Sequence, residues 1–168
     1  MKNWFAAFNI YLCLILLGPG CASIEKAKQK REQSTLRFHL EVNQDGTGRS
    51  GPVLVTHDRI PINVEKEPFI TEGDLEKALV IDTLGGFAIQ VVFDAIATAH
   101  LDLITSANKG HHIAIMTQFP KTHWVAAPLI NRRIATGIFT FTPDLTCEEA
   151  QRMVRGLNNV AAKAKKAK

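Results

Sequence analysis

The stretch from Ala127 to Leu157 constrains the fold of this chain most, because it contains four successive structural signals. It begins in a predicted strand from Trp124 to Ile130, and after a polar turn the apolar run Ile134 to Phe141 is typical of another strand. Thr146 and Glu149 then have the spacing of a capping box, the arrangement that satisfies free backbone N–H groups at the start of a helix. The stretch therefore predicts two strands, the turn between them and a capped helix.

Similar start signals predict two further helices. Thr71 and Asp74 form a second capping-box pattern, and Leu75, Ala78 and Leu79 would be the apolar face of the helix that follows. Asp94 can cap a helix over residues 95–107, which Asn108, Lys109 and Gly110 would end. The predicted buried face of that helix is Ile96, Ala97, Leu101, Ile104 and Ala107. The helix after Thr146 would bury Ala150, Met153, Val154, Leu157 and Ala161.

Apolar residues alternate with polar ones in several other segments, which is the period of a half-buried strand. The alternation covers residues 36–42, 52–56, 60–64 and 113–115. Residues 87–93 are apolar on both faces, which indicates a central strand. We therefore expect an α+β domain with a mixed, mainly antiparallel sheet and about three helices packed on one face.

The amino terminus has the pattern of an export signal. Lys2 precedes an apolar run from Trp4 to Leu17, which is shorter than the ~20 residues that cross a bilayer. A small residue stands just before Cys21, as in the lipobox of bacterial lipoproteins, although Gly18 and Pro19 depart from the usual box. We expect residues 1–20 to be a signal peptide and Cys21 to be the lipid-attachment site, which predicts a palmitate-bearing, membrane-anchored lipoprotein. An ordinary cleavage, giving a secreted periplasmic protein, is the alternative.

The remaining chain divides by composition into three parts. Residues 21–35 are charged and contain no aromatic side chain, so we expect a flexible tether, with positive residues that could contact anionic lipid. Residues 36–161 would form one domain, and residues 162–168 a basic tail. Loss of Lys2 with the signal lowers the formal charge from +4 to about +3, too mild to indicate a nucleic-acid partner. Cys147 would be the only thiol of the domain and is expected to be a half-buried structural residue.

Taken in order, the segments of this chain resemble a known family. The segments are KEPFITEGDLEKA (66–78), VVFD (91–94), ANKGHHIAI (107–115) and the stretch 127–157. They resemble, in order and spacing, the head subdomain of the first periplasmic domain of SecD, a membrane subunit of bacterial Sec protein export. The resemblance covers about residues 60–157 and contains no catalytic signature. It implies a module that contacts an emerging polypeptide outside the membrane.

The chain departs from the SecD pattern in two places. The hairpin turn is QFPKTH (118–123) instead of the usual Asp-Gly, and no transmembrane helix follows the signal, so the translocation activity of the family does not carry over. We therefore expect a non-enzymatic envelope lipoprotein without a cofactor or catalytic residue. Its expected partners are the membrane, through the lipid, and a polypeptide or another envelope protein. Strand addition to an open sheet edge is one way to bind such a partner, and protein export is one process that the protein could serve.

A small metal-dependent or hydrolytic periplasmic enzyme is the alternative. His111, His112 and His123 could meet across the hairpin, but the close ligand spacing of a zinc signature is missing. Arg132 and Arg133 could recognise an acidic group, yet adjacent strand residues point to opposite faces, so a solvated turn is favoured. The sequence contains no Gly-rich phosphate loop and no nucleophile elbow.

Overall fold

The computed structural model describes residues 20–44, 46–55, 60–119 and 121–167. Residues 1–19, which hold nearly all of the predicted signal peptide, lie outside the described residues. The chain separates into two compact units, one up to Arg31 and one from Glu32 onward. The described part of the first unit is the helix α2 (Gly20–Arg31).

Helix α2 occupies most of the segment that was predicted as a tether. Its residues from Glu25 to Arg31 are exposed, and its sequence has almost no apolar face. Lys28, Lys30 and Arg31 lie in the last turn, where positive side chains interact favourably with the negative end of the helix dipole. A helix of twelve residues whose sequence has almost no apolar face is only marginally stable by itself.

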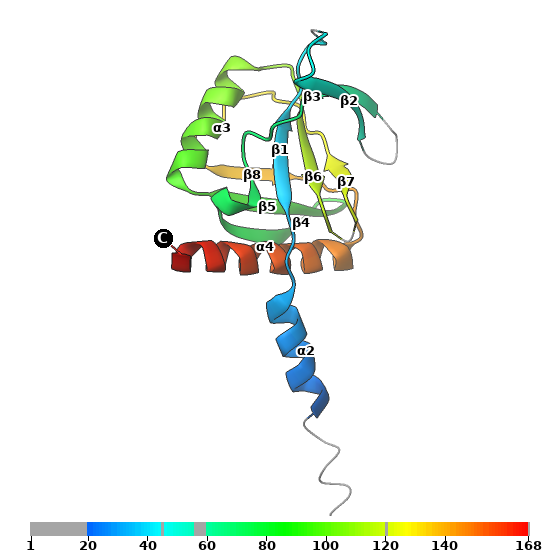
Figure 1. The fold of residues 1–168 in the computed structure, drawn as a ribbon, viewed down its shortest axis with the longest axis vertical. Helices are drawn as coiled ribbons and strands as arrows, with labels where there is room; N and C mark the ends of the chain where they lie inside the picture. Colours follow the sequence, from blue (N-terminus) through cyan, green and yellow to red (C-terminus); the bar gives the residue numbers. More distant parts are fainter. Residues whose placement is uncertain (1–19, 45, 56–59, 120, 168) are drawn as a thin grey trace, which may run out of the picture. The chain divides into compact units, whose positions relative to one another are not determined.

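The described residues of the second unit form eight strands in three antiparallel sheets (Figure 1). The first sheet has the order β1-β6-β7, the second consists of β2 and β3, and the third has the order β4-β5-β8. The strands are β1 (Leu36–Leu40), β2 (Ser50–Val55), β3 (Ile60–Glu65), β4 (Leu75–Thr83), β5 (Gly86–Phe93), β6 (Ile113–Thr117), β7 (His123–Ala126) and β8 (Ile138–Phe141). The α+β class with antiparallel pairing is confirmed, and β5 is a central strand as its sequence predicted.

One main core joins the first and third sheets to the two helices over residues 95–107 and 147–167. Phe38 of β1 is fully buried and meets the rings of Phe93 and Phe139 edge-on, with centroids 5.3 and 5.7 Å apart. Such edge-to-face pairs stabilise a core by ~0.5–1.5 kcal/mol beyond their burial. A smaller cluster of Val55, Ile62, Val64 and Ala114 holds the second sheet against the first.

Helix α3 (Ala95–Ala107) has the predicted bounds and the predicted cap. The Asp94 carboxylate accepts a hydrogen bond from the Ala97 N–H at 2.9 Å. Its buried face is Ala97, Leu101 and Thr105. Ile96 and Ala107 were predicted to be buried, but Ile96 is 69% exposed and Ala107 is exposed as well. The helix is therefore apolar on an exposed side as well.

Helix α4 (Cys147–Ala167) also begins at its predicted capping box. The Thr146 N–H and hydroxyl both donate to the Glu149 carboxylate, and the Glu149 N–H donates back to the hydroxyl. These bonds hold the pKa of Glu149 below its ordinary value. The predicted buried face is confirmed at all five positions, Ala150, Met153, Val154, Leu157 and Ala161. The helix continues through the segment that was predicted as a basic tail.

The helix predicted after Thr71 is wrong. The Thr71 and Asp74 side chains do form the capping box, but they enclose only the 3₁₀ turn η1 (Glu72–Asp74), and β4 starts at Leu75. The register of β4 shifts between Leu75 and Lys77, so that Leu75 and Ala78 are both buried. A bulge in a strand thus produces the three-residue spacing that suggested a helix.

Candidate functional site

A cavity of about 900 Å³ lies beside β8. Its walls are the segment 128–136, the residues 138–140 of β8 and Ile113 of β6. The lining is apolar at Leu129, Ile130, Ile134, Ile138 and Phe139. Among these, Leu129 and Ile138 are 52% and 45% exposed. The cavity is large enough for several side chains of a bound chain.

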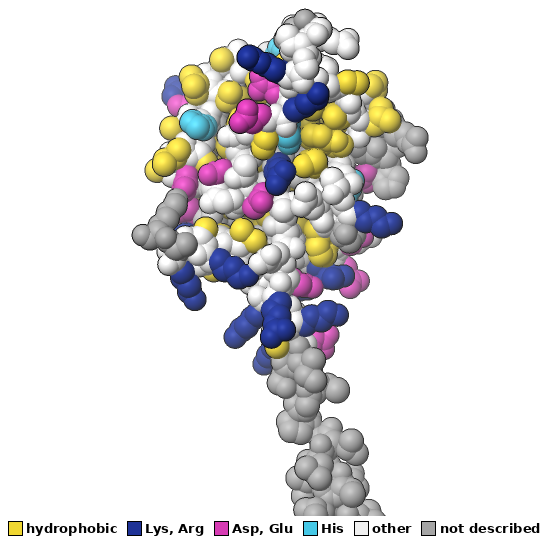
Figure 2. Space-filling view, viewed as in Figure 1, with side chains coloured by type: hydrophobic (Ala, Val, Ile, Leu, Met, Phe, Trp, Pro, Cys, Tyr) yellow, Lys and Arg dark blue, Asp and Glu magenta, His cyan; other side chains and the backbone are white. Residues whose placement is uncertain are grey.

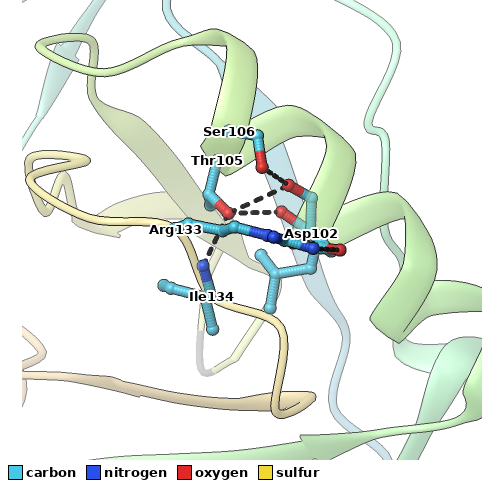
Figure 3. Close-up of polar contacts among 6 residues, drawn as sticks. Asp102, Thr105, Ser106, Arg133 and Ile134 are labelled. Carbon is cyan, nitrogen blue, oxygen red and sulfur yellow. Dashed lines mark hydrogen bonds and ion pairs between the residues drawn. The ribbon is translucent and has the colours of Figure 1, made fainter.

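Helix α3 fixes the outer wall of this cavity (Figure 3). The Thr105 hydroxyl donates to the Leu101 carbonyl at 2.7 Å and accepts from the Ile134 N–H at 2.9 Å. Arg133 forms a two-pronged ion pair with Asp102, with one N–O distance of 2.6 Å. The hydrogen bond from Arg133 lowers the pKa of Asp102, and the bond to Asp102 raises the pKa of Arg133.

Gly137 connects this wall to β8 at a point where no other residue fits well. Its φ of 68° lies in the left-handed region, which favours glycine. A Cβ atom built there would lie 2.2 Å from the Thr98 hydroxyl oxygen of α3. Glycine therefore allows the chain to turn into β8 directly against the helix.

The outer edge of β8 points its backbone groups away from β5. The Phe93 N–H donates to the Gly137 carbonyl, so the hydrogen-bonded pairs of this ladder continue at Phe139 and Phe141. Backbone groups alternate in direction along an antiparallel strand. The N–H and C=O groups of Ile138 and Thr140 therefore point outward, and both residues line the cavity. The Ile138 N–H has a long bond of 3.3 Å to the Thr136 hydroxyl.

The opposite wall has a similar free position. Pro128 and Ile130 are hydrogen-bonded to residues 113 and 111, and Leu129 bridges His112 between them. By the same alternation, the N–H and C=O of Leu129 point away from β6. The cavity thus lies between two segments that each present outward backbone groups.

The other edge of the third sheet is closed by helix α4. Ala78 of β4 donates its N–H to the Asn158 side-chain oxygen at 2.8 Å and accepts from the Asn158 side-chain nitrogen at 2.9 Å. These are the two bonds that a neighbouring strand would form. No further strand can pair at Ala78.

The remaining strand edges are covered or blocked within the described residues. Residues 69 and 70 are hydrogen-bonded to Phe38 of β1, and the Asp144 N–H donates to Val125 of β7. On β2, the ladder alternation places Ser50, Pro52 and Leu54 at outward positions, and Pro52 interrupts this edge because proline has no N–H to donate. In the part of the chain that the structure describes, β8 is therefore the edge most open to another strand.

The structure separates the residues that the sequence suggested for a metal site. His112 contacts the Glu41 carboxylate at 2.7 Å and His111 contacts the Glu41 carbonyl, whereas the His123 Nδ1 lies 2.7 Å from the Lys121 carbonyl. The bonds from His112 help to lower the pKa of Glu41, against the effect of burial. Among the described residues, no group of three or more His, Cys, Asp or Glu side chains could hold a metal ion.

Two other predicted residues are placed differently from expectation. Cys147 is exposed, not half-buried, because it lies at the first turn of α4. Arg132 and Arg133 lie in an exposed loop, as expected, but this loop is also the wall of the cavity. The side chain of Cys21, the predicted lipid site, is outside the described part of the structure. The sequence suggested an open sheet edge but did not indicate β8, because the pairing partners are far apart along the chain.

Comparison with known proteins relates this fold to SecDF. Searches of protein-family models and of curated proteins found no match. A solved structure of SecDF, a membrane component that enhances protein export, is similar with a TM-score of 0.59 and 18% identity over 85% of this chain and 70% of that chain. SecDF in its super-membrane-facing form gives a TM-score of 0.58 and 18% identity over 84% of this chain. This chain spans only 21% of that second SecDF chain.

These likenesses show a SecD-like fold. They agree with the resemblance read from the order of segments in the sequence, although they do not distinguish the head subdomain from other parts of SecD. No helix in the described residues is long and apolar enough to cross a bilayer.

Proposed function

We propose that this protein is a non-enzymatic, lipid-anchored envelope module that binds an extended polypeptide by adding it as a strand to β8. The observation that carries the proposal is the open β8 edge beside a cavity of about 900 Å³. A bound chain would take hydrogen bonds from the outward groups of Thr140 and Ile138. Its alternate side chains would enter the cavity, whose lining is part polar and part apolar. Strand addition usually combines affinity with selectivity in this way.

The module's connection with protein export rests on its SecD-like fold. SecDF is described as a component that enhances protein export. We infer that this chain contacts polypeptides or envelope proteins at the periplasmic face of a bacterial membrane, where Cys21 would carry the lipid. Without acylation the same module would act as a secreted periplasmic protein.

Backbone methylation of a peptide tests strand addition directly. The probe is a fluorescent nine-residue peptide of alternating valine and serine. It is prepared in three forms, with all amides free, with the odd-numbered amides methylated, or with the even-numbered amides methylated. If the peptide pairs with β8, methylation of the alternate amides that face β8 should weaken binding at least about tenfold, or ~1.4 kcal/mol. Methylation of the other set of amides, which face away from β8, removes the hydrogen bonds to Leu129 and should weaken binding less. Equal binding of all three peptides would exclude strand pairing.

A pair of variants at one residue tests the site in the protein. Thr140→Pro removes the outward N–H, while Thr140→Val keeps it and changes only the side chain. We expect the proline variant to lose peptide binding and the valine variant to retain it. Circular dichroism would establish that both variants are folded. Loss of binding in both, or in neither, would place the binding elsewhere.

Fatty-acid labelling tests the proposed anchor. Cys21→Ser should abolish incorporation of labelled palmitate and release the protein from the membrane fraction. Cys147→Ser, at the exposed thiol of α4, should leave both unchanged. A Cys21→Ser variant that still incorporates palmitate would refute the anchor without affecting the peptide-binding proposal.

A further inference from the structure

Helix α3 has an apolar stripe on its outer side. Ile96 and Leu103 are 69% and 67% exposed, and the exposed residues Ala99 and Ala107 lie on the same side of the helix. The spacing of three, four and four residues is that of a helix-packing seam. Figure 2 shows hydrophobic side chains at the surface in the region of α3. Large apolar side chains gathered in this way mark an interaction surface more often than isolated ones.

A groove of about 420 Å³ continues this stripe. Its apolar walls are Leu103 and Ile104 of α3 together with Pro68 and Phe69. The remaining lining residues are His100, Glu65 and Glu67. The groove contains no lysine or arginine, and neither exposed carboxylate has an ion pair within the part of the chain that the structure describes.

We propose that this surface binds a basic amphipathic helix of a partner protein. The apolar face of that helix would cover Ile96, Ala99 and Leu103, because a second helix can pack its side chains between those of an exposed helical row. The small side chain of Ala99 permits close approach of the two backbones. Lysine or arginine along one border of the partner would meet Glu65 and Glu67, so the charges select a basic helix over an acidic one.

This surface is separate from the β8 site. Asp102 and Thr105 bind the loop that walls the β8 cavity, whereas Ile96 and Leu103 project from another side of α3. The cavity and the groove share no lining residue. The proposal therefore does not depend on peptide binding at β8.

Two designed peptides test the proposal. Both are 21-residue amphipathic helices with leucine at the apolar positions, and they carry either lysine or glutamate at the positions that border the leucines. The protein should bind the lysine peptide at least about tenfold more tightly than the glutamate peptide. Leu103→Ser should weaken binding of the lysine peptide by a similar factor. Leu84→Ser, which changes an even more exposed leucine in the β4–β5 turn, should not.

Charge reversal separates recognition from non-specific adhesion. With Glu65→Lys and Glu67→Lys combined, the preference should shift to the glutamate peptide, since the border charges are inverted. Equal binding of the two peptides, or no effect of Leu103→Ser, would overturn the proposal. Binding of the unacylated protein to phosphatidylglycerol vesicles that is lost in Leu103→Ser would assign the stripe to a membrane surface instead, and would also overturn it.

Discussion

The side chain of Asn158 takes the place of a neighbouring strand beside Ala78. It accepts from the Ala78 N–H and donates to the Ala78 carbonyl, across 80 residues of sequence. Ala78 is 1% exposed, so its backbone groups could not reach water if Asn158 were absent. The pairing fixes α4 along β4 and leaves the third sheet with one open edge.

Asn158→Ala should lower the free energy of unfolding by ~1–3 kcal/mol, because it leaves a buried N–H and C=O without partners. Urea denaturation followed by circular dichroism measures the change. Gln151→Ala, at an exposed position of the same helix, is the matched control and should change stability by less than ~0.5 kcal/mol. An equal effect of the two substitutions would show that the edge is not held by Asn158.

Gly137→Ala should destabilise the protein more than Gly110→Ala. Both glycines have positive φ values, 68° and 88°, so both substitutions cost ~1 kcal/mol or more of backbone strain. Only at Gly137 does the added Cβ also collide with Thr98. Thermal denaturation should show the larger loss for Gly137→Ala, with partial recovery when Thr98→Ala is added. Without recovery, the difference would have another cause.

Thr105→Val should loosen the loop that walls the cavity. Valine has nearly the same shape, but the Ile134 N–H loses its acceptor. We expect faster hydrogen exchange at the Ile134 amide and a loss of ~1–3 kcal/mol in stability. Ser106→Ala removes a neighbouring hydroxyl that bonds only within α3 and should leave the Ile134 amide unchanged. Equal exchange in the two variants would contradict this anchoring role.

The free energy of unfolding should decrease as the pH is lowered from 7 to about 5, because of His39. Its side chain is buried beside Trp124, its Nδ1 lies 2.8 Å from the Glu65 carbonyl, and its Nε2 has no partner. Burial lowers the pKa of His39 below its ordinary value of about 6.5. As the pH falls, His39 is therefore protonated in the unfolded chain before it is protonated in the folded chain. The number of bound protons is then larger in the unfolded state, and stability rises with pH.

Unfolding free energies measured at several pH values check this expectation. The slope between pH 7 and pH 5 should be reduced in His39→Phe, even if that variant is less stable overall. The lowered pKa of Glu41 and Glu149 acts in the same direction but below about pH 4.5, outside this window. An unchanged slope in His39→Phe would assign the effect to another group.

Local sequence signals predicted a helix correctly where a single capping side chain marks its first turn. Asp94 and Thr146 each cap the helix that was expected after them. The same signal at Thr71 led to a wrong helix, because a cap satisfies only the first turn and cannot say whether the chain continues as a helix. The bulge at Leu75 then buried residues three apart, which periodicity alone does not distinguish from a helix.

The candidate site depends on long-range pairing that the sequence does not display. Asn158 reaches Ala78 and closes the β4 edge, so β8 is left as the free edge of this sheet, and Gly137 passes Thr98 where the chain enters β8. Each contact joins segments that are distant in sequence. Alternation of apolar residues indicates which face of a strand is buried, but it does not reveal which edge lacks a neighbour.

Because Asn158 closes one side of the three-stranded sheet, strand addition to this protein ends after a single step. A chain that pairs with β8 lengthens the sheet in one direction only, and two copies that met through β8 would stop as a closed dimer. Continuous growth of the kind that produces fibrils needs two complementary edges on each molecule. The same asparagine that stabilises α4 would therefore limit the proposed strand addition at β8 to one bound chain per molecule.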